Sequence, residues 1–160
     1  CDIGHRPAKG LPMRIADILR AKGSAVATVT ATTTVTGLLA ELAVHNIGAM
    51  VVIGPDADGQ ECVIGIVSER DVVRHLQTTG PDLMRRPVAD IMSEVAVTCG
   101  PGDAVDDLAT LMTNNRVRHV PVLDGGRLVG IVSIGDVVKN RMEELQAERQ
   151  QLQAYITQGG

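Results

Sequence analysis

Aromatic side chains are almost missing from this sequence of 160 residues, which has one tyrosine and neither phenylalanine nor tryptophan. The hydrophobic core must therefore be built from Val, Ile, Leu, Met and Ala. A flat ligand would have to be held between aliphatic side chains instead of being stacked on aromatic rings. The sequence also has no uninterrupted run of 18 apolar residues, so we expect no membrane-spanning helix and no membrane partner.

An excess of basic charge is missing as well. The chain has 15 Lys and Arg residues against 19 Asp and Glu residues, a net charge of −4, and so lacks the basic field that nucleic-acid binding needs. Its cysteines and histidines are scattered without the close spacing of a metal site, and we expect no metal. Three cysteines without a CxxC pair suit a reducing compartment and predict a cytoplasmic protein.

The sequence contains an internal repeat. Residues 65–71 (GIVSERD) return 65 positions later as residues 130–136 (GIVSIGD), and the pattern of residues 35–53 returns 70 positions later. The difference between the two offsets falls in a turn, GPDADG in the first copy, where changes of length are tolerated. The chain is therefore a duplication.

From this repeat we predict a first module over residues 13–80, a linker over 81–87 and a second module over 88–140. An extended helix and tail follow over residues 141–160. Residues 1–12 show no periodicity and are interpreted as a loose leader or an expression remnant.

Each copy has the pattern of a β-α-β-β-α unit. A short apolar run (residues 26–29 and 95–98) precedes an amphipathic helix, with Thr34 and Asp103 at the expected N-cap positions. A hairpin with a Gly/Asp turn follows, and a second helix begins directly after each GIVS sequence. Units of about sixty residues bury too little apolar surface alone, so we predict an α+β fold whose two modules pack through their sheets.

Both copies carry a Gly-x-x-Ser-x-x-Asp motif where a strand ends and a helix begins. Ser68 and Ser133 stand where the free N–H groups of a helix start favour an anion. One turn later, Asp71 and Asp136 could accept hydrogen bonds from a ribose. The alternative is that the serines only cap their helices. The presence of the motif in both copies favours a binding site.

These two motifs, with the sequence RHVPV of residues 118–122, make the chain similar to a tandem pair of cystathionine β-synthase (CBS) domains of the stand-alone type, called a Bateman module. The resemblance covers roughly residues 13–138. It implies two modules related by a pseudo-twofold axis, with clefts between them that bind adenine nucleotides or related adenosyl ligands. It also implies association into dimers and no catalytic domain.

By this resemblance, Asp71 and Asp136 would hold ribose hydroxyls, and Ser68 and Ser133 would lie beside the ribose and phosphate. Arg70 would face phosphate. The second motif has glycine at the position of Arg70, so the resemblance implies that the two sites are not equivalent.

Arg118 and His119 could add phosphate contacts near the second site. The basic groups of the two copies would serve either separate ligands or one phosphate chain, and the sequence leaves both open. An adenine slot must be aliphatic, although Met50 and Val120 could equally be core residues. The candidates for this slot are Met50 and Val51 in one copy and Val120 and Pro121 in the other.

The sequence therefore predicts a regulatory, ligand-sensing module without catalytic residues, not an enzyme. AMP is the first candidate ligand, and ADP, ATP, NAD(H) and S-adenosylmethionine stay open. Binding would change the conformation of the module or of an unidentified client protein. An a/d seam from Val138 to Ile156 favours contact with a partner helix and a homodimer. The competing hypothesis is a dimeric interaction or scaffold protein that binds no nucleotide.

Overall fold

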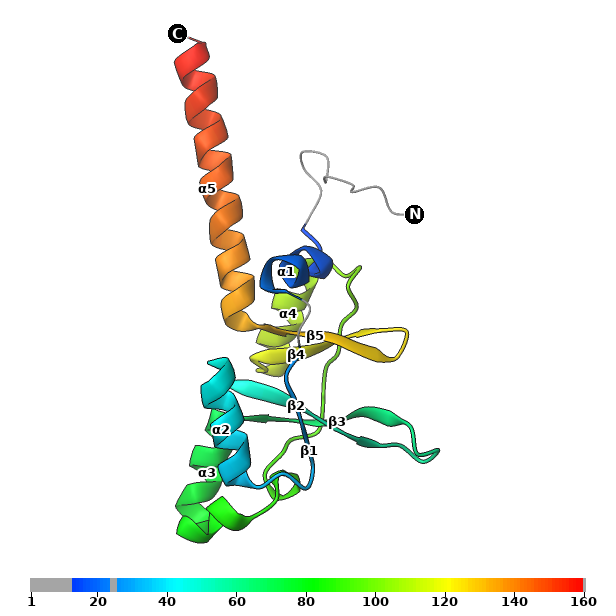
Figure 1. Ribbon diagram of the computed structural model, residues 1–160. Helices are drawn as coiled ribbons and strands as arrows, with labels where there is room; N and C mark the ends of the chain where they lie inside the picture. The colour runs from blue at the N-terminus through cyan, green and yellow to red at the C-terminus, as the bar shows by residue number, and fades with distance from the viewer. Residues whose placement is uncertain (1–12, 24–25, 160) are drawn as a thin grey trace.

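Two small sheets face each other at the centre of the molecule, and helices lie on their outer sides (Figure 1). The computed structural model describes residues 13–23 and 26–159, so the predicted leader, residues 1–12, lies outside the described residues. The elements follow the order α1 (Ile15–Lys22), β1 (Thr28–Thr30), α2 (Val35–His45), β2 (Ala49–Pro55), β3 (Glu61–Ser68), α3 (Glu69–Thr79), η1 (Pro81–Arg85), η2 (Val88–Asp90), α4 (Val105–Asn115), β4 (His119–Asp124), β5 (Arg127–Ser133) and α5 (Ile134–Gln158).

The two hairpins confirm the predicted repeat. Strands β2 and β3 pair in antiparallel fashion, with Ala49 opposite Ser68, and β4 and β5 pair in the same way, with His119 opposite Ser133. Each hairpin also has an irregularity at the same place, after Val52 in the first copy and after its counterpart in the second. Mixed helices and strands in this arrangement confirm the predicted α+β fold.

The first strand of the two repeats differs between the copies. Strand β1 pairs with β2 in parallel over three residues, whereas the predicted strand at residues 95–98 does not form. Its place is taken by a single bridge between Cys99 and Val122, because the chain turns away again at Gly100. Residues 95–98 are instead an extended connection that leads from the first module to the second (Figure 1).

The helix caps were predicted correctly in one copy and wrongly in the other. Thr34 is the N-cap of α2, and its hydroxyl accepts a hydrogen bond from the Gly37 N–H at 3.1 Å. Asp103 does not cap α4, whose N-cap is Ala104. The Asp103 carboxylate accepts a hydrogen bond from the Gly100 N–H instead, because it closes the preceding turn.

The two hydrophobic cores do not follow the order of the chain. Helix α1 opens the first repeat, but Ile15 and Ile18 are buried in the core built on α4, β4 and β5. The segment that opens the second repeat is buried in the first core, through Val88 and Ile91. Each module thus receives its leading segment from the other repeat. The domain boundaries given above follow the repeat along the chain and stay a prediction.

The same backbone hydrogen bonds hold both leading segments. Ile15 N–H donates to the Asp103 carbonyl at 3.0 Å, and Val88 N–H donates to the Thr33 carbonyl at 2.7 Å. These pairs occupy equivalent positions of the two repeats. The exchange is therefore a symmetric property of the fold that ties the two modules together.

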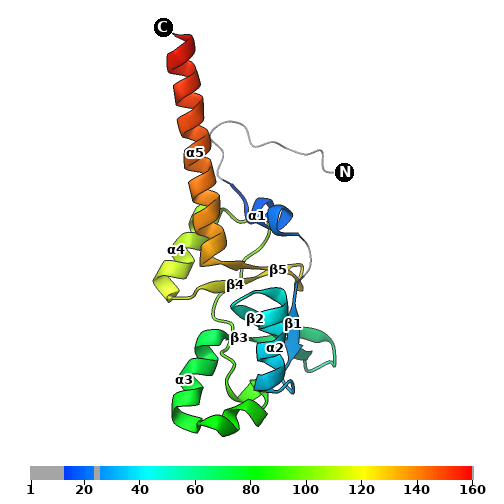
Figure 2. The same cartoon turned by 60° about the vertical axis from the view of Figure 1, so that its left-hand side comes forward.

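Helix α5 is much longer than its counterpart α3 and extends away from both modules (Figure 2). Its predicted a/d seam is exposed, and the exposed fractions of its apolar members range from 50% at Leu145 to 72% at Ile156. No helix in the described ranges, 13–23 and 26–159, is both long and apolar enough to cross a membrane.

Candidate functional site

The first Gly-x-x-Ser-x-x-Asp motif forms the start of α3. Ser68 is the N-cap, and its hydroxyl accepts a hydrogen bond from the Asp71 N–H at 3.3 Å. In return, the Asp71 carboxylate accepts hydrogen bonds from the Ser68 N–H at 2.9 Å and the Ser68 hydroxyl at 3.1 Å. This capping box fixes the carboxylate at the mouth of the helix start. The capping alternative is thus realised, and it leaves further lone pairs of Asp71 for a ligand.

The second motif forms the same capping box at the start of α5. The Ser133 N–H donates to the Asp136 carboxylate at 2.8 Å, and the Asp136 N–H donates to the Ser133 hydroxyl at 3.1 Å. Lys22, at the end of α1, adds a contact that the first motif lacks. Its ammonium group donates to Asp136 and to the Ile131 carbonyl, both at 2.7 Å.

This ion pair decides the charge state of Asp136. Burial raises the pKa of its carboxyl, but the hydrogen bonds from Lys22 and Ser133 and the charge of Lys22 together lower it by more. The net effect holds the pKa of Asp136 below its ordinary value of 3.8. At neutral pH the carboxylate is ionised and its charge is satisfied within the chain.

The glycine of each motif is needed for the exchanged leading segment. A Cβ atom at Gly65 would lie 2.8 Å from the Met92 sulfur and 3.0 Å from the Ser93 carbonyl oxygen. A Cβ atom at Gly130 would collide with the Leu19 side chain. The close approach at these glycines is therefore made by the protein itself.

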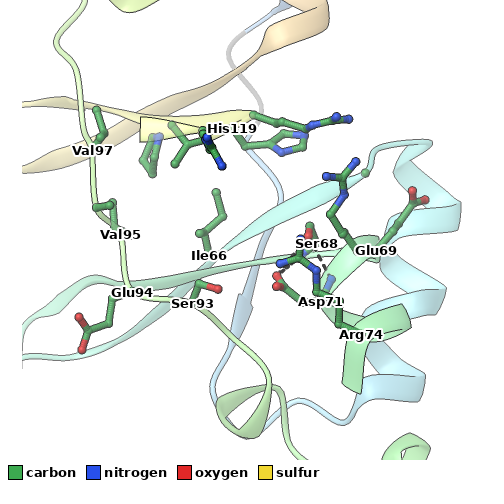
Figure 3. Close-up of a pocket in the computed structure, with 17 residues that line it drawn as sticks. Ile66, Ser68, Glu69, Asp71, Arg74, Ser93, Glu94, Val95, Val97 and His119 are labelled. Carbon is green, nitrogen blue, oxygen red and sulfur yellow. Dashed lines mark hydrogen bonds between the residues drawn. The ribbon is translucent and has the colours of Figure 1, made fainter. Parts of the chain in front are cut away.

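A cavity of about 340 Å³ lies between the two modules at the start of α3 (Figure 3). We call it the inter-module cavity. Its volume falls in the lower part of the range of small-molecule sites, about 300–1,000 Å³. Its walls come from both repeats: the start of α3, the extended stretch of residues 93–97, and residues 116–121.

Six of the predicted site residues line this cavity, and five do not. The six come from the first motif and from the start of β4: Ser68, Arg70, Asp71, Arg118, His119 and Pro121. Ser133 and Asp136 lie at the other helix start, beside Lys22. Met50, Val51 and Val120 do not line the cavity and are at most 1% exposed, with Met50 and Val120 in the two hydrophobic cores.

Other residues supply the aliphatic wall in place of those three. Ile66, Val95 and Val97 lie together at one end of the cavity, while Ser68 and Asp71 lie at the other end (Figure 3). The sequence pattern missed this wall because residues 95–98 look like an ordinary β strand. Val95 and Val97 line the cavity because this stretch is instead the extended connection between the two modules.

Two arginines at the cavity were also missed. Arg74 lies one helical turn after Arg70 on α3, and Arg116 lies at the C-cap of α4. The spacing of four residues after Arg70 was a usable signal for Arg74, since residues at i and i+4 share a helix face. The cavity therefore gathers Arg70, Arg74, Arg116 and Arg118. The basic groups of the two repeats, whose destination the sequence left open, converge on one cavity.

His119 is the one histidine on the cavity wall within the described chain. Burial lowers its pKa below the ordinary value of 6.5, and the nearby charges of Lys22 and Arg118 act in the same direction. Asp136 and Glu69 oppose this effect without cancelling it. His119 is therefore neutral at pH 7, and an anion in the cavity would raise its pKa.

Metal chemistry has no candidate cluster in the described part of the chain. No three His, Cys, Asp or Glu side chains of residues 13–23 and 26–159 gather in a way that could hold a metal ion. Cys99 is buried, and this burial, with a smaller effect of Asp103, raises the pKa of its thiol to about 11. It is a core residue at the position that Val29 occupies in the first repeat.

Comparison with known proteins identifies the family. The CBS domain pattern matches residues 15–78 and 88–143. A CBS domain-containing protein of Arabidopsis thaliana, named as mitochondrial, is 38% identical over 152 residues, which cover 91% of this chain and 72% of the relative. Because this relative is named as mitochondrial, the cytoplasmic location stays a prediction.

Solved structures agree with this match. The crystal structure of a CBS-domain containing protein from Agrobacterium tumefaciens has a TM-score of 0.73 and 41% identity, and the match covers 81% of this chain and 99% of that one. A CBS domain protein from Pyrobaculum aerophilum, complexed with AMP, has a TM-score of 0.66 and 29% identity over 78% of this chain and 89% of that one. Each matched stretch of the sequence contains one repeat and one Gly-x-x-Ser-x-x-Asp motif. The chain belongs to the CBS domain family and carries two CBS domains in tandem.

Proposed function

We propose that this pair of CBS domains is a regulatory module that binds an adenosine nucleotide in the inter-module cavity. One observation carries the proposal: a single cavity brings Ser68 and Asp71 of the first repeat together with Arg118 and His119 of the second. A ligand there contacts both modules, so its affinity depends on their relative orientation. Coupling of this kind is sufficient for regulation and needs no catalytic group.

The two ends of the cavity suit the two ends of a nucleotide. In this proposal the adenine lies between the aliphatic side chains of Ile66, Val95 and Val97, and the ribose hydroxyls donate to Asp71. The phosphate lies among the arginines and the start of α3, where free N–H groups and the helix dipole favour an anion. The AMP complex of the Pyrobaculum aerophilum relative supports this class of ligand.

The ultraviolet spectrum of the purified protein gives a sensitive first test. With a single tyrosine and no tryptophan, the protein absorbs little, so a co-purified adenine nucleotide would dominate the spectrum. Chromatography of the small molecules released by denaturation would identify it. AMP, ADP and ATP are then added back to the stripped protein and followed by calorimetry. Failure to bind any of them would contradict the proposal and favour the scaffold hypothesis.

The duplicated motif offers a matched pair of variants for the ribose contact. Asp71→Asn removes a charged acceptor but keeps an oxygen that can cap α3, so the fold should persist. We expect its affinity for AMP to fall by about tenfold, the effect of losing about 1.4 kcal/mol of a hydrogen bond to a charged group. Asp136→Asn is the control and should not show this tenfold loss, because Asp136 does not line the cavity. Equal affinities in both variants and the wild type would show the ribose assignment to be wrong.

We also propose that a second copy of the chain covers the exposed seam of α5. The seam consists of Val138, Met142, Leu145, Arg149, Leu152 and Ile156, spaced as the a and d positions of a coiled coil. Its apolar members are at least half exposed, so pairing with an identical helix would remove them from water. Such a homodimer would also carry a change in module orientation from one copy to the other.

Sedimentation equilibrium tests this pairing. Leu145→Glu places a charge in the seam and should convert the dimer into a monomer. Ala147→Glu adds the same charge to the same helix at an exposed position outside the seam and should leave the dimer intact. A wild-type protein that stays monomeric at the concentrations of the binding experiments would contradict the homodimer, without affecting the nucleotide proposal.

A further inference from the structure

Four arginines surround the inter-module cavity without a carboxylate partner. In the described residues, Arg20, Arg86 and Arg141 each form an ion pair with a nearby Asp or Glu. None of the described ion pairs or side-chain hydrogen bonds includes a guanidinium group of the cavity set: Arg70, Arg74, Arg116 and Arg118. In a chain with a net charge of −4, these unpaired cations are concentrated at one place.

Their positions are unfavourable for the isolated protein. Arg70 and Arg74 lie four residues apart on α3, and like charges at this spacing repel each other and destabilise a helix. Arg116 adopts a left-handed backbone conformation, with φ of 54°. Its counterpart in the first repeat, φ 51°, is Asn46, a residue type that tolerates this conformation better than arginine does. Helix stability and backbone conformation therefore do not explain these arginines, whereas an anionic ligand would.

The acidic residues on the cavity wall do not neutralise the set. Asp71 is held by Ser68 in the capping box. Glu94 lies at the opposite end of the cavity, beside Val95 (Figure 3), and neither Glu94 nor Glu69 forms any of the described ion pairs. The arginines come from α3 on one side and residues 116–118 on the other, so an anion placed between these walls is reached from both modules.

A single phosphate carries too little charge for four guanidinium groups. A terminal phosphate has three strong acceptor oxygens and a charge of about −2 at neutral pH. Two arginines, each donating two parallel hydrogen bonds, already neutralise this charge. The other two are left without a counter-charge unless the ligand has further phosphate groups.

We propose that the inter-module cavity selects an adenosine polyphosphate, ADP or ATP, over AMP, and that Arg74 and Arg116 are the residues that determine this selectivity. The proposal rests on the proposed function and specifies its ligand. Arg70, inside the first motif, and Arg118, directly before β4, contact the phosphate nearest the ribose. Arg74, one turn further along α3, and Arg116, two residues before Arg118, contact the phosphates beyond it.

Calorimetry with AMP, ADP, ATP and inorganic tripolyphosphate, at one fixed salt concentration and with the full chain, tests the proposal. We expect the wild type to bind ADP or ATP at least about tenfold more tightly than AMP. Arg74→Ala and Arg116→Ala should each weaken ATP binding by about tenfold and change AMP binding by less than about twofold. Arg86→Ala is the matched control, because Arg86 is paired with Asp90 and does not line the cavity. A thermal melt of each variant shows that it is folded.

The outcomes separate this proposal from the one on which it rests. Equal affinities for AMP and ATP, or variants that weaken both nucleotides equally, would overturn the polyphosphate selectivity and leave the nucleotide site standing. Binding of tripolyphosphate without any adenosine nucleotide would overturn both proposals, since the cavity would then be a simple anion site. Selective loss of ATP affinity in Arg74→Ala and Arg116→Ala supports both.

Discussion

The start of α3 and the start of α5 carry the same motif and form the same capping box, yet they meet different neighbours. At α3, Asp71 faces the inter-module cavity, and Val95, in the extended connection between the modules, lies on the opposite wall. At α5, Asp136 is bound by Lys22. The leading segments repeat with an offset of 73, as Ile15 and Val88 show, so Lys22 is the counterpart of Val95. Because α1 stays helical as far as Lys22 whereas residues 93–97 are extended, the leading segments leave one helix start open and neutralise the carboxylate of the other.

We expect the largest loss of stability from substitutions at the motif glycines, which the exchanged leading segments contact closely. Gly65→Ala should lower the free energy of unfolding by about 2 kcal/mol, because the added Cβ meets the Ser93 backbone oxygen as well as Met92. Gly130→Ala meets only the end of the Leu19 side chain and should cost about 1 kcal/mol. Urea unfolding measures both.

A second substitution sharpens this contrast. Leu19→Ala should remove most of the additional cost of Gly130→Ala, since it removes the colliding atoms. Met92→Ala should leave most of the cost of Gly65→Ala in place, because the Ser93 carbonyl remains. Equal rescue in the two repeats would contradict the difference between the two contacts.

Lys22→Met tests the ion pair at the second helix start. We expect the pKa of Asp136 to rise, since burial then acts with less opposition, and the free energy of unfolding at pH 7 to fall by up to about 1 kcal/mol. In the wild type this stabilisation is complete above pH 3.8, the ordinary pKa of Asp136, and is lost as the pH falls through its lower pKa in the folded protein. NMR titration of the carboxyl carbon measures the pKa, and Lys139→Met is the control for loss of a lysine that forms no described ion pair.

Protonation of His119 should change stability and anion affinity by a smaller amount that depends on pH. Because its pKa is lowered in the folded protein, stability is full above pH 6.5 and falls as the pH drops from 6.5 toward that lower pKa. An anion in the cavity favours the protonated ring, so affinity for tripolyphosphate should rise over the same interval, by less than about tenfold per pH unit for one proton. His119→Gln should remove the part due to the protein. An unchanged pH profile in this variant would exclude His119 from the effect.

The smallest expected difference is in the thiol reactivity of the two described cysteines. Cys62 is half-buried, whereas the pKa of the buried Cys99 thiol is raised to about 11. A thiol reagent at pH 8 should therefore modify Cys62 and leave Cys99 unmodified until the protein unfolds. Cys99→Val, which copies Val29 of the first repeat, should leave the number of fast-reacting thiols unchanged. Rapid modification of Cys99 in the native protein would show that the second core opens.

The repeat, the two hairpins, the helices α2 to α5 and the Gly-x-x-Ser-x-x-Asp motifs were predicted from the sequence because each depends on a local pattern. Alternating apolar residues, Gly/Asp turns and the Ser-x-x-Asp spacing act within a few residues of one another. Two predictions from local patterns were wrong. The Asp103 carboxylate binds the Gly100 N–H of the preceding turn instead of capping α4. The apolar residues 95–98 form an extended connection instead of a strand.

Tertiary structure alone decided which residues meet at the cavity. Exchange of the leading segments, set by the burial of Ile15, Ile18, Val88 and Ile91, brought Lys22 to Asp136 and Val95 to the wall of the inter-module cavity. It also assigned Met50 and Val120 to the cores and brought Arg116 opposite α3. These contacts join residues far apart in the chain, and they follow from the burial of apolar faces between modules, which no local pattern encodes. The sequence by itself determined the two copies of the motif, and the packing of the copies determined how they differ.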